Sequence, residues 1–424
     1  MNRLIHHVLA IILSKNNTGT VARNTLYLTI SEIILKILGI AWIVFLAHMF
    51  SVTEYGKYNL VTSFIAIFSF LPDFGIGLIV IREIAKNTKN SSVYLGNAFV
   101  INGFLSLTTF LIIVGVIYGF SININVSGLI LIAAATLILS TLRSVAIFYF
   151  DGREKMQYSA SLNTLNSILL IAFATIGVLL GFGLMGVFGG MLLGTFISLV
   201  VSWGVLLRFI KPKFVVNPKI IKFYLLSGAP LAIASFASLI FMRVDILILG
   251  ILLGGEAVGV YSSATPFAFA LIQLLNVPFV VSVYPALSRI QKEDAVRFER
   301  GIVKSLGVIA MWSIPAAIII AITSNILIPL IFGNKYDAGI PVLRVLILFV
   351  PFLSLSAFLY KILIILGKQK DYLIISVLGA VLNISLNFLL IPHYGLLGAA
   401  WSAVITQILL FIIYSLDVYR ALRK

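Results

Sequence analysis

Charged residues interrupt several long apolar runs of this chain. Arg243 and Asp245 lie inside the run from Phe241 to Tyr261. Residues two apart point about 200° away from each other around a helix, so these two side chains cannot neutralise each other within a regular helix. An ionisable residue in a membrane-spanning run is a candidate functional residue that faces a bundle interior or a water-filled cavity. We therefore predict that Arg243 lies in a central cavity and that Asp245 contacts another helix.

Three further cations fall inside apolar runs. Glu32 and Lys36 are four residues apart, which places them on one face of a helix and allows them to pair. Lys36 lies roughly 18 Å from the inner end of its run, near the middle of a membrane. A cavity-facing position is favoured for Lys36 over an ion pair between packed helices. Arg143 and Arg344 are shallower, so each could line the cavity or extend toward the membrane surface.

A proline and a carboxylate stand together in the second apolar run. Pro72 and Asp73 belong to the sequence LPDFGIG. Proline removes a helical hydrogen bond and the two glycines loosen the same turn, which predicts a kink with exposed carbonyls beside a carboxylate. Pro278 occupies the matching region of the second half of the chain. Such a pair of kinks could act as hinges. The alternative is a static kink at Pro72, with Asp73 paired to a neighbouring helix.

Other kinds of chemistry have little support. The chain has no cysteine, and its four histidines show no metal-ligand spacing. No glycine-rich phosphate loop with its lysine is found, so we expect no metal, no cofactor and no ATP hydrolysis. Uncharged amides inside the runs are more often hydrogen-bonding groups between helices than ligands. These amides are Asn97, Asn102, Asn163, Asn166, Gln273, Asn383 and Asn387.

The composition indicates the elements that carry these residues. Hydrophobic residues make up 61% of the 424 residues and charged residues 10%; the mean hydropathy is +1.14. About twelve apolar runs are each long enough to cross a hydrocarbon core. The runs are continuous rather than alternating, so they are helices and not barrel strands. We predict an all-α polytopic membrane protein of about 12 transmembrane helices.

The distribution of basic residues predicts the orientation. Loops on the side of the N-terminus hold 24 of the 30 Lys and Arg residues, the opposite loops hold only Lys57 and Lys335, and four lie inside spans. The positive-inside rule then places both termini in the cytoplasm, with an even number of spans in the cell membrane. Because the cations are spread over short loops, the net charge of +16 is no sign of nucleic-acid binding.

Internal repetition predicts two lobes. Gly56 and Tyr58 match Gly259 and Tyr261 at an offset of 203 residues, and GLMG at 183–186 matches GLLG at 395–398. Two parallel six-helix lobes around a central cavity account for this pattern. The predicted division is an interfacial N-terminal segment at 1–23 that includes a short helix at Leu4 to Leu13, a first lobe at 24–210, a basic cytoplasmic linker at 211–220 and a second lobe at 221–424. The ninth span is long enough to end in a partly re-entrant piece around Ile328 to Phe332.

Several motifs resemble a known family. They are the first span with its exit (ARNTLYLTISEIILKILGIAWIVFLAHMFSVTEYGKYNLVTSF), REIAK, MRVDILILGILLGGEAVGVYSSATPF, VPFVVSVYPALSRI, IPLIFGNKY and GLLGAAWS. Together they resemble the polysaccharide or O-antigen flippases of the Wzx type, within the multidrug/oligosaccharidyl-lipid/polysaccharide exporter superfamily. The resemblance covers essentially the whole chain, although each motif alone is only moderately specific.

The resemblance implies a two-lobed transporter, not an enzyme, with a cationic central cavity. Its cargo would be a polyprenyl phosphate- or pyrophosphate-linked saccharide that moves to the outer leaflet by alternating access. Membrane lipids, the glycan polymerase and the glycosyltransferases of the same pathway are the implied partners. The cations Arg243, Lys36, Arg344 and Arg143 are then the candidates for substrate binding. The candidates for coupling or gating are Asp73, Glu32, Asp245, Pro72 and Pro278.

Three other functions compete with this reading. A cation-coupled multidrug exporter of the same superfamily should have more carboxylates than cations in its spans, and this chain has the opposite balance. A cell-wall lipid-precursor flippase typically has two further C-terminal spans. A membrane glycan polymerase or ligase would normally need a large external loop, and the external loops predicted here are short.

Overall fold

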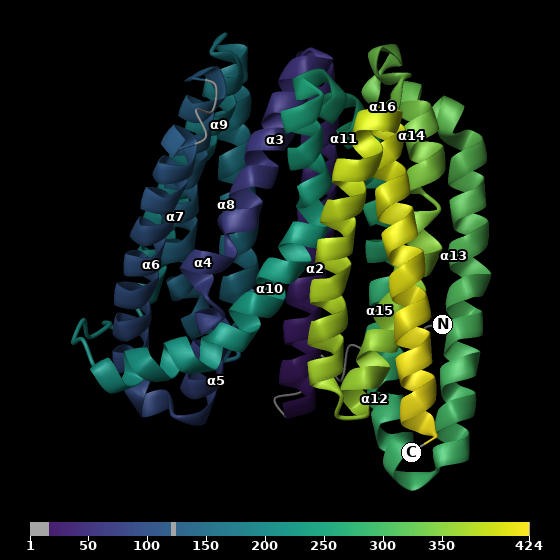
Figure 1. Cartoon of the computed structure of the whole chain (residues 1–424). Helices are drawn as coiled ribbons and strands as arrows, with labels where there is room; N and C mark the ends of the chain where they lie inside the picture. Colours follow the sequence, from purple (N-terminus) through teal and green to yellow (C-terminus); the bar gives the residue numbers. More distant parts are fainter. Residues whose placement is uncertain (1–16, 120–123, 424) are drawn as a thin grey trace, which may run out of the picture. The chain divides into compact units, whose positions relative to one another are not determined.

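The computed structural model describes residues 17–119 and 124–423, which form helices and short connections (Figure 1). The predicted helix at Leu4 to Leu13 lies outside the described residues. In the first half of the chain the elements are α2 (Asn17–Met49), α3 (Val52–Phe68), α4 (Phe70–Asp73), α5 (Ile76–Lys86), η1 (Thr88–Asn90), α6 (Ser91–Gly119), α7 (Ile124–Gly152), α8 (Met156–Leu179) and α9 (Gly183–Leu207).

The second half of the chain begins with the long helix α10. Its elements are α10 (Pro218–Leu252), α11 (Gly254–Leu271), the π-helix η2 (Ile272–Asn276), α12 (Val277–Glu293), α13 (Ala295–Phe332), η3 (Asn334–Tyr336), α14 (Gly339–Leu346), α15 (Phe349–Ile365) and α16 (Gln369–Leu422).

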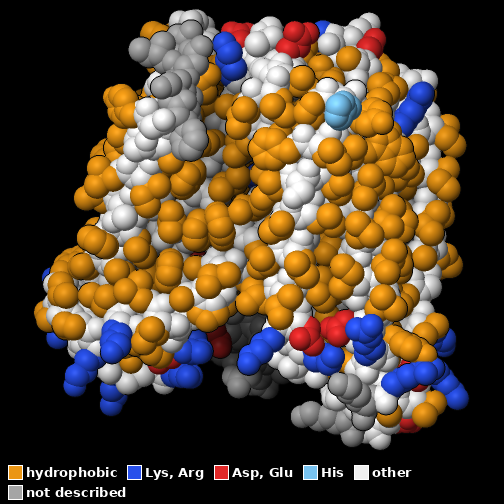
Figure 2. All heavy atoms as spheres, viewed as in Figure 1, with side chains coloured by type: hydrophobic (Ala, Val, Ile, Leu, Met, Phe, Trp, Pro, Cys, Tyr) orange, Lys and Arg blue, Asp and Glu red, His pale blue; other side chains and the backbone are white. Residues whose placement is uncertain are grey.

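The described residues contain 11 segments that are long and apolar enough to cross a membrane. The last of them, α16, joins two helices across a kink at Gly395, where φ is 57° and ψ is −132°. Counting α16 twice gives the predicted twelve spans. Figure 2 shows hydrophobic side chains over most of the visible face, with Lys and Arg side chains mostly at its margins.

The chain divides into two compact units whose boundary cuts through helices. Among the described residues, unit 1 comprises those within 1–45 and 64–235, and unit 2 comprises those within 46–63 and 236–424. Helices α2, α3 and α10 therefore contribute to both units. The two sequence lobes at 24–210 and 221–424 remain a prediction about how the chain repeats, whereas these units describe how it packs.

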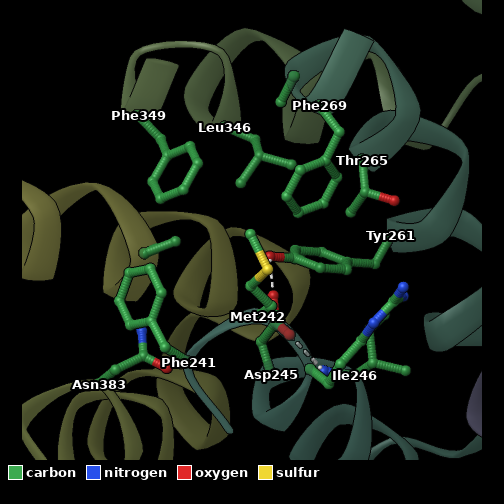
Figure 3. A pocket seen from close by; sticks show the side chains of 13 residues that line it. Phe241, Met242, Asp245, Ile246, Tyr261, Thr265, Phe269, Leu346, Phe349 and Asn383 are labelled. Carbon is green, nitrogen blue, oxygen red and sulfur yellow. Dashed lines mark hydrogen bonds between the residues drawn. The ribbon is translucent and has the colours of Figure 1, made fainter. Parts of the chain in front are cut away.

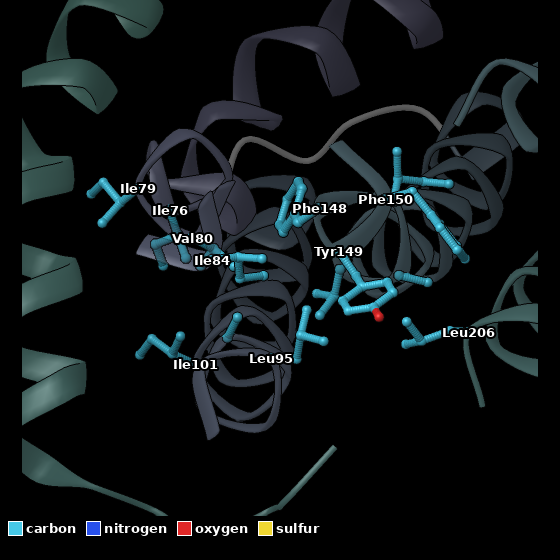
Figure 4. Close-up of a cluster of buried hydrophobic side chains, with 14 of the residues drawn as sticks. Ile76, Ile79, Val80, Ile84, Leu95, Ile101, Phe148, Tyr149, Phe150 and Leu206 are labelled. Atoms are coloured by element: carbon cyan, nitrogen blue, oxygen red, sulfur yellow. The ribbon is translucent and has the colours of Figure 1, made fainter. Parts of the chain in front are cut away.

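The core of unit 1 joins α5, α6 and α7 (Figure 4). Ile76, Val80 and Leu95 are fully buried there, and Phe150 is buried with them. The segment between α9 and α10 is held against α6 by Asn97, whose Nδ2 donates to the Val215 carbonyl oxygen at 3.0 Å. The Asn97 Oδ1 accepts from the backbone N–H of Asn217 at 2.8 Å. The predicted linker at 211–220 is thus ordered on unit 1.

The second span is broken where LPDFGIG predicts a kink. Phe74 and Gly75 adopt left-handed conformations, with φ of 45° and 71°, between α4 and α5. The Asp73 carboxylate accepts hydrogen bonds from the backbone N–H groups of Gly75 and Gly77. The predicted kink is confirmed, whereas the exposure of its carbonyl groups stays a prediction. Asp73 ends α4 and accepts from N–H groups at the start of α5, and it forms no ion pair with another helix among the described residues.

Two other irregularities bear on the predictions. The π-helix η2 precedes α12, and Pro278 stands in the first turn of α12, although its side chain lies outside the described residues. Helix α13 continues without interruption through Ile328 to Phe332, even though Pro315 and Pro329 lie inside it. The expected re-entrant piece is therefore absent from this described helix.

The end of α2 and the start of α3 form a hairpin, Leu46–Ser63, that packs within unit 2. The Lys335 ammonium group donates to the carbonyl oxygens of Phe50 at 2.6 Å and His48 at 3.4 Å. The Tyr336 hydroxyl donates to the carbonyl oxygen of Ala47 at 3.4 Å. These donors satisfy carbonyls at the end of α2 that lack an intrahelical partner, and the cation also matches the negative end of the helix dipole.

Glycines from the two sequence repeats meet at this hairpin. A Cβ atom added to Gly56 would lie 1.7 Å from the Gly255 carbonyl oxygen, and one added to Gly259 would lie 2.1 Å from that of Val52. Beside the crossing, the ring of Tyr55 meets that of Tyr336 at 5.7 Å between centroids. The repeat glycines therefore allow the backbones of α3 and α11 to touch.

Replacing Gly56 by Ala tests this close crossing. The added methyl group would overlap the Gly255 carbonyl group, so we expect a loss of about 1–3 kcal/mol in the free energy of unfolding. Gly307→Ala is the control, because nothing lies within 4 Å of a Cβ atom at that position. Thermal unfolding of the purified variants in detergent measures both effects. Equal unfolding midpoints for the two variants would contradict the crossing.

Candidate functional site

A pocket in unit 2 gathers polar and aromatic side chains from α10, α11, α14, α15 and α16 (Figure 3). Its polar lining includes Arg243 and Asp245 from the run that the sequence singles out. The residues that line it are Phe241, Met242, Arg243, Asp245, Ile246, Tyr261, Thr265, Ala268, Phe269, Leu346, Phe349, Asn383 and Ala403.

Asp245 is anchored by two hydrogen bonds. Its Oδ2 accepts from the Tyr261 hydroxyl at 2.5 Å, and its Oδ1 accepts from the backbone N–H of Ile246 at 2.9 Å. Tyr261 is fully buried on α11. The prediction that Asp245 contacts another helix is confirmed, and this contact ties α10 to α11.

Arg243 lines the same pocket and is half-buried. Within the part of the chain that the structure describes, its guanidinium group has no hydrogen bond and no ion pair, with Asp245 or with any other carboxylate. Asp245 and Arg243 thus do not neutralise each other directly, as their two-residue spacing predicts. The guanidinium donors remain available to a ligand.

Aromatic rings form much of the rest of the pocket wall. The rings of Phe241 and Phe349 stack with centroids 6.3 Å apart and an angle of 24° between their planes. Asn383 is buried and donates from Nδ2 to the Thr406 hydroxyl at 3.4 Å. A cation can bind an anionic group by charge-assisted hydrogen bonds. Aromatic rings can pack against the apolar face of a ring in the same ligand, and an amide can bond to its hydroxyl groups.

Arg344 is exposed on α14 of unit 2 and does not line this pocket. Its Nε donates to the Ser324 hydroxyl at 3.1 Å and its Nη2 donates to the Asn325 Oδ1 at 2.8 Å, both on α13. The partners of Arg344 are uncharged. The side chain therefore keeps its positive charge uncompensated in a fixed position.

The cations of unit 1 have different surroundings from each other. Lys36 and Glu32 are both exposed on α2, and no ion pair joins them among the described residues. Arg143 is only 9% exposed inside the bundle, so it does not extend to the surface. Its Nη2 donates to the Asn163 Oδ1 at 3.1 Å. Of the four predicted cations, Arg243 alone lines the pocket described above.

The candidates for coupling also separate by environment. Asp73 caps α5, Pro72 is buried in α4, and Glu32 is exposed. Asp245 alone combines a place in the pocket with a tyrosine partner. The coupling and gating roles of all these residues, together with Pro278, remain predictions.

Sequence reasoning missed three residues that matter to unit 2. The sequence indicated Tyr261 only as the residue that matches Tyr58 in the internal repeat. Its hydrogen bond to Asp245 depends on how α10 packs against α11. Lys335 and Tyr336 cap the end of α2 from a loop that is 285 residues away from Phe50. The one available signal was that Lys335 is one of only two cations in the loops predicted to be external.

A model of the polysaccharide biosynthesis protein family matches residues 21–291. The chain is also similar to a curated protein of Haloferax volcanii, the probable low-salt glycan biosynthesis flippase Agl15. The two are 23% identical over 391 residues, which cover 89% of this chain and 79% of that relative.

Two solved structures share the fold. The lipid II flippase MurJ in an inward closed conformation aligns with a TM-score of 0.77 at 16% identity, over 93% of this chain and 87% of that one. An inward-facing MATE family multidrug resistance transporter of the MOP superfamily gives a TM-score of 0.73 at 16% identity, over 94% and 98% of the two chains. At such identities the likeness concerns the fold alone.

The Asp245–Tyr261 contact can be tested by a double-mutant cycle. Tyr261→Phe removes a hydrogen bond to a charged group, so we expect a loss of about 1.5–3 kcal/mol in the free energy of unfolding. After Asp245→Asn the same change should cost less, because the charge has gone. Unfolding in mixed micelles with increasing SDS provides the measurement. Tyr394→Phe, at a site that is 64% exposed, is the control. Additive losses would contradict the contact.

Proposed function

Because the chain belongs to the polysaccharide biosynthesis protein family, we propose that it is a transporter that flips a polyprenyl phosphate- or pyrophosphate-linked oligosaccharide across the cell membrane. The similarity to a glycan biosynthesis flippase over most of both chains supports this proposal. The product would serve polysaccharide or glycoconjugate export. Both termini are proposed to be cytoplasmic, on the basis of the distribution of Lys and Arg among the loops.

The observation that carries the proposal is the unpaired guanidinium of Arg243 in an aromatic-lined pocket. A phosphate or pyrophosphate that enters a low-dielectric site needs compensating cations, and a planar guanidinium can bind two phosphate oxygens at once. Arg243 has no protein partner among the described residues that would have to be displaced first. It is therefore the residue assigned to the phosphate.

The remaining parts of the substrate would be handled separately. Phe241, Phe349 and Asn383 would contact sugars by stacking and hydrogen bonding, while the lipid tail stays in the bilayer. Lys36 and Arg344 are proposed to contribute positive charge along the path. Arg143 belongs to the same set of predicted cations, although it is buried inside unit 1 and does not line the Arg243 pocket. The glycan polymerase and glycosyltransferases of the pathway are proposed partners.

Alternating access would use the interrupted helices. The break at Phe74 and Gly75, next to Pro72 and Asp73, gives the second span a place to bend. The π-helix before Pro278 gives a comparable place in the second half. Hinges are commonly a few residues at the ends of elements that absorb changes in backbone dihedral angles.

A cation-coupled multidrug exporter is the second candidate, because the fold is also that of a MATE family transporter. The charge of the pocket disfavours it, since Arg243 would repel a cationic drug. A cationic dye and a lipid-linked oligosaccharide, offered to the same proteoliposomes, discriminate the two functions by which of them is moved.

Substitution of Arg243 tests the site. Loss of a hydrogen bond to a charged group costs about 1.5–3 kcal/mol, so Arg243→Ala should lower the initial flipping rate roughly 10- to 100-fold. Arg243→Lys keeps the charge but loses the planar guanidinium, so its flipping rate should lie between those of the wild type and Arg243→Ala. A fluorescent lipid-linked oligosaccharide in proteoliposomes reports the rate. Arg300→Ala, at an exposed position on α13, is the control. An unchanged rate in Arg243→Ala would exclude the assignment.

Asp245 is proposed as the coupling group, because its carboxylate shares the pocket with Arg243 and is held by Tyr261. If it carries a proton during the cycle, an imposed pH gradient should change the flipping rate of the wild type but not that of Asp245→Asn. Asp371→Asn, in the first turn of α16 and outside the pocket, should respond like the wild type. Equal responses of the wild type and Asp245→Asn would remove Asp245 from coupling.

A further inference from the structure

Arg143 is a buried cation whose charge is balanced by no group within the described part of the chain. It lies on α7 inside unit 1 with only 9% of its surface exposed. The Nη2 atom donates to Asn163, whereas Nε and Nη1 are buried without a hydrogen-bond partner. Among the residues 17–119 and 124–423, no carboxylate forms an ion pair with it. Two nitrogen atoms of a permanent cation, which carry three N–H groups, are thus buried in the bundle without an acceptor.

Other polar groups lie at the same level on the neighbouring helices. On α9, the Trp203 Nε1 donates to the Leu142 carbonyl oxygen at 3.0 Å, which places the adjacent Ser202 level with Arg143. On α6, a Cβ atom added to Gly103 would lie 3.7 Å from the Leu142 side chain, which places the adjacent Asn102 at this level too. Asn102 and Ser202 are fully buried.

Helices α8 and α9 extend this polar layer. Their backbones touch where Gly194 meets Leu169, with 2.7 Å from an added Cβ atom to the Leu169 carbonyl oxygen. One turn farther along the same interface lie Ser198 on α9 and Asn166 on α8. The buried side-chain atoms of these neighbouring residues that have no hydrogen-bond partner are Asn102 Nδ2 and Oδ1, Asn166 Oδ1, Ser198 Oγ and Ser202 Oγ.

The chemistry of the layer favours an anion. A guanidinium group stays protonated, and burying it without a counter-charge costs several kcal/mol. The unpartnered groups around it belong to two amides and to serine hydroxyls, none of which carries a negative charge. The Asn102 Nδ2 and the hydroxyls can donate hydrogen bonds, whereas the amide oxygens can only accept them. A bound anion would accept from Nε and Nη1 of Arg143 and would remove the uncompensated charge.

We propose that this layer binds a small inorganic monovalent anion, chloride in the cell, with Arg143 as its counter-charge. A single negative charge balances a single guanidinium, whereas a pyrophosphate would leave excess charge buried. The 9% exposure of Arg143 also keeps a bulky lipid-linked headgroup away from it. The site belongs to unit 1, is distinct from the Arg243 pocket in unit 2, and does not depend on the proposed function.

Thermal unfolding of the full-length purified protein tests the site. A ligand that binds the folded state raises the unfolding midpoint as its concentration increases. Replacing gluconate by chloride at constant ionic strength should therefore raise the midpoint of the wild type progressively. Arg143→Gln should show no rise. Arg153→Gln, an exposed arginine just beyond the end of α7, should respond like the wild type and thereby controls for the loss of one charge.

Three outcomes would overturn the proposal. They are a wild-type midpoint that chloride does not move, an equal rise in Arg143→Gln, and a rise through Arg143 with inorganic phosphate but not with chloride. The last outcome would assign Arg143 to the phosphate headgroup instead. If Arg143→Gln does not fold, wild-type crystals grown in bromide decide the question. An anomalous peak beside Arg143 supports the site, and a map without such a peak rejects it.

Discussion

A peptide group in hydrocarbon has no water with which to exchange hydrogen bonds, so every N–H and C=O in a span must find a partner within the protein. Uninterrupted helices meet this requirement by themselves. Interrupted ones need help from side chains. At the break after α4, Asp73 accepts from the N–H groups of Gly75 and Gly77. At the end of α2, Lys335 and Tyr336 donate to the free carbonyls. Charged residues here are therefore part of the fold.

This requirement separates the charges of the chain into two groups. Asp73 and Lys335 form hydrogen bonds with backbone groups. Each lies at the helix end where the helix dipole favours the sign of its charge. Burial also raises the pKa of the Tyr336 hydroxyl, which keeps it a donor to Ala47. Among the described residues, no group accepts from the Arg243 guanidinium or from Nε and Nη1 of Arg143, so a ligand is the natural partner of these two cations.

Several predictions that depend on local sequence were correct, whereas several features that depend on the packing of distant helices were not predicted. Apolar run length depends only on the local sequence, and it gave the spans correctly. The two-residue spacing of Arg243 and Asp245 is also local, and it correctly separated their side chains. Tyr261 as the partner of Asp245, the burial of Arg143 and the capping by Lys335 depend on which faces of distant helices meet. Helical periodicity alone does not contain that information. Likewise, the sequence repeats place residues 46–63 in the first lobe, whereas these residues pack within unit 2.

The Leu46–Ser63 hairpin has a consequence for biosynthesis. It leaves the ribosome among the first segments of the chain, yet Lys335 caps it across a separation of 285 residues. Until those later residues are inserted, the hairpin lacks its glycine contacts and the donors for its carbonyls. Contacts of such long sequence separation form late and at an entropic cost. We therefore expect lipid or insertion factors to hold the hairpin at this early stage. A C-terminal half synthesised alone would lack residues 46–63, which pack within unit 2.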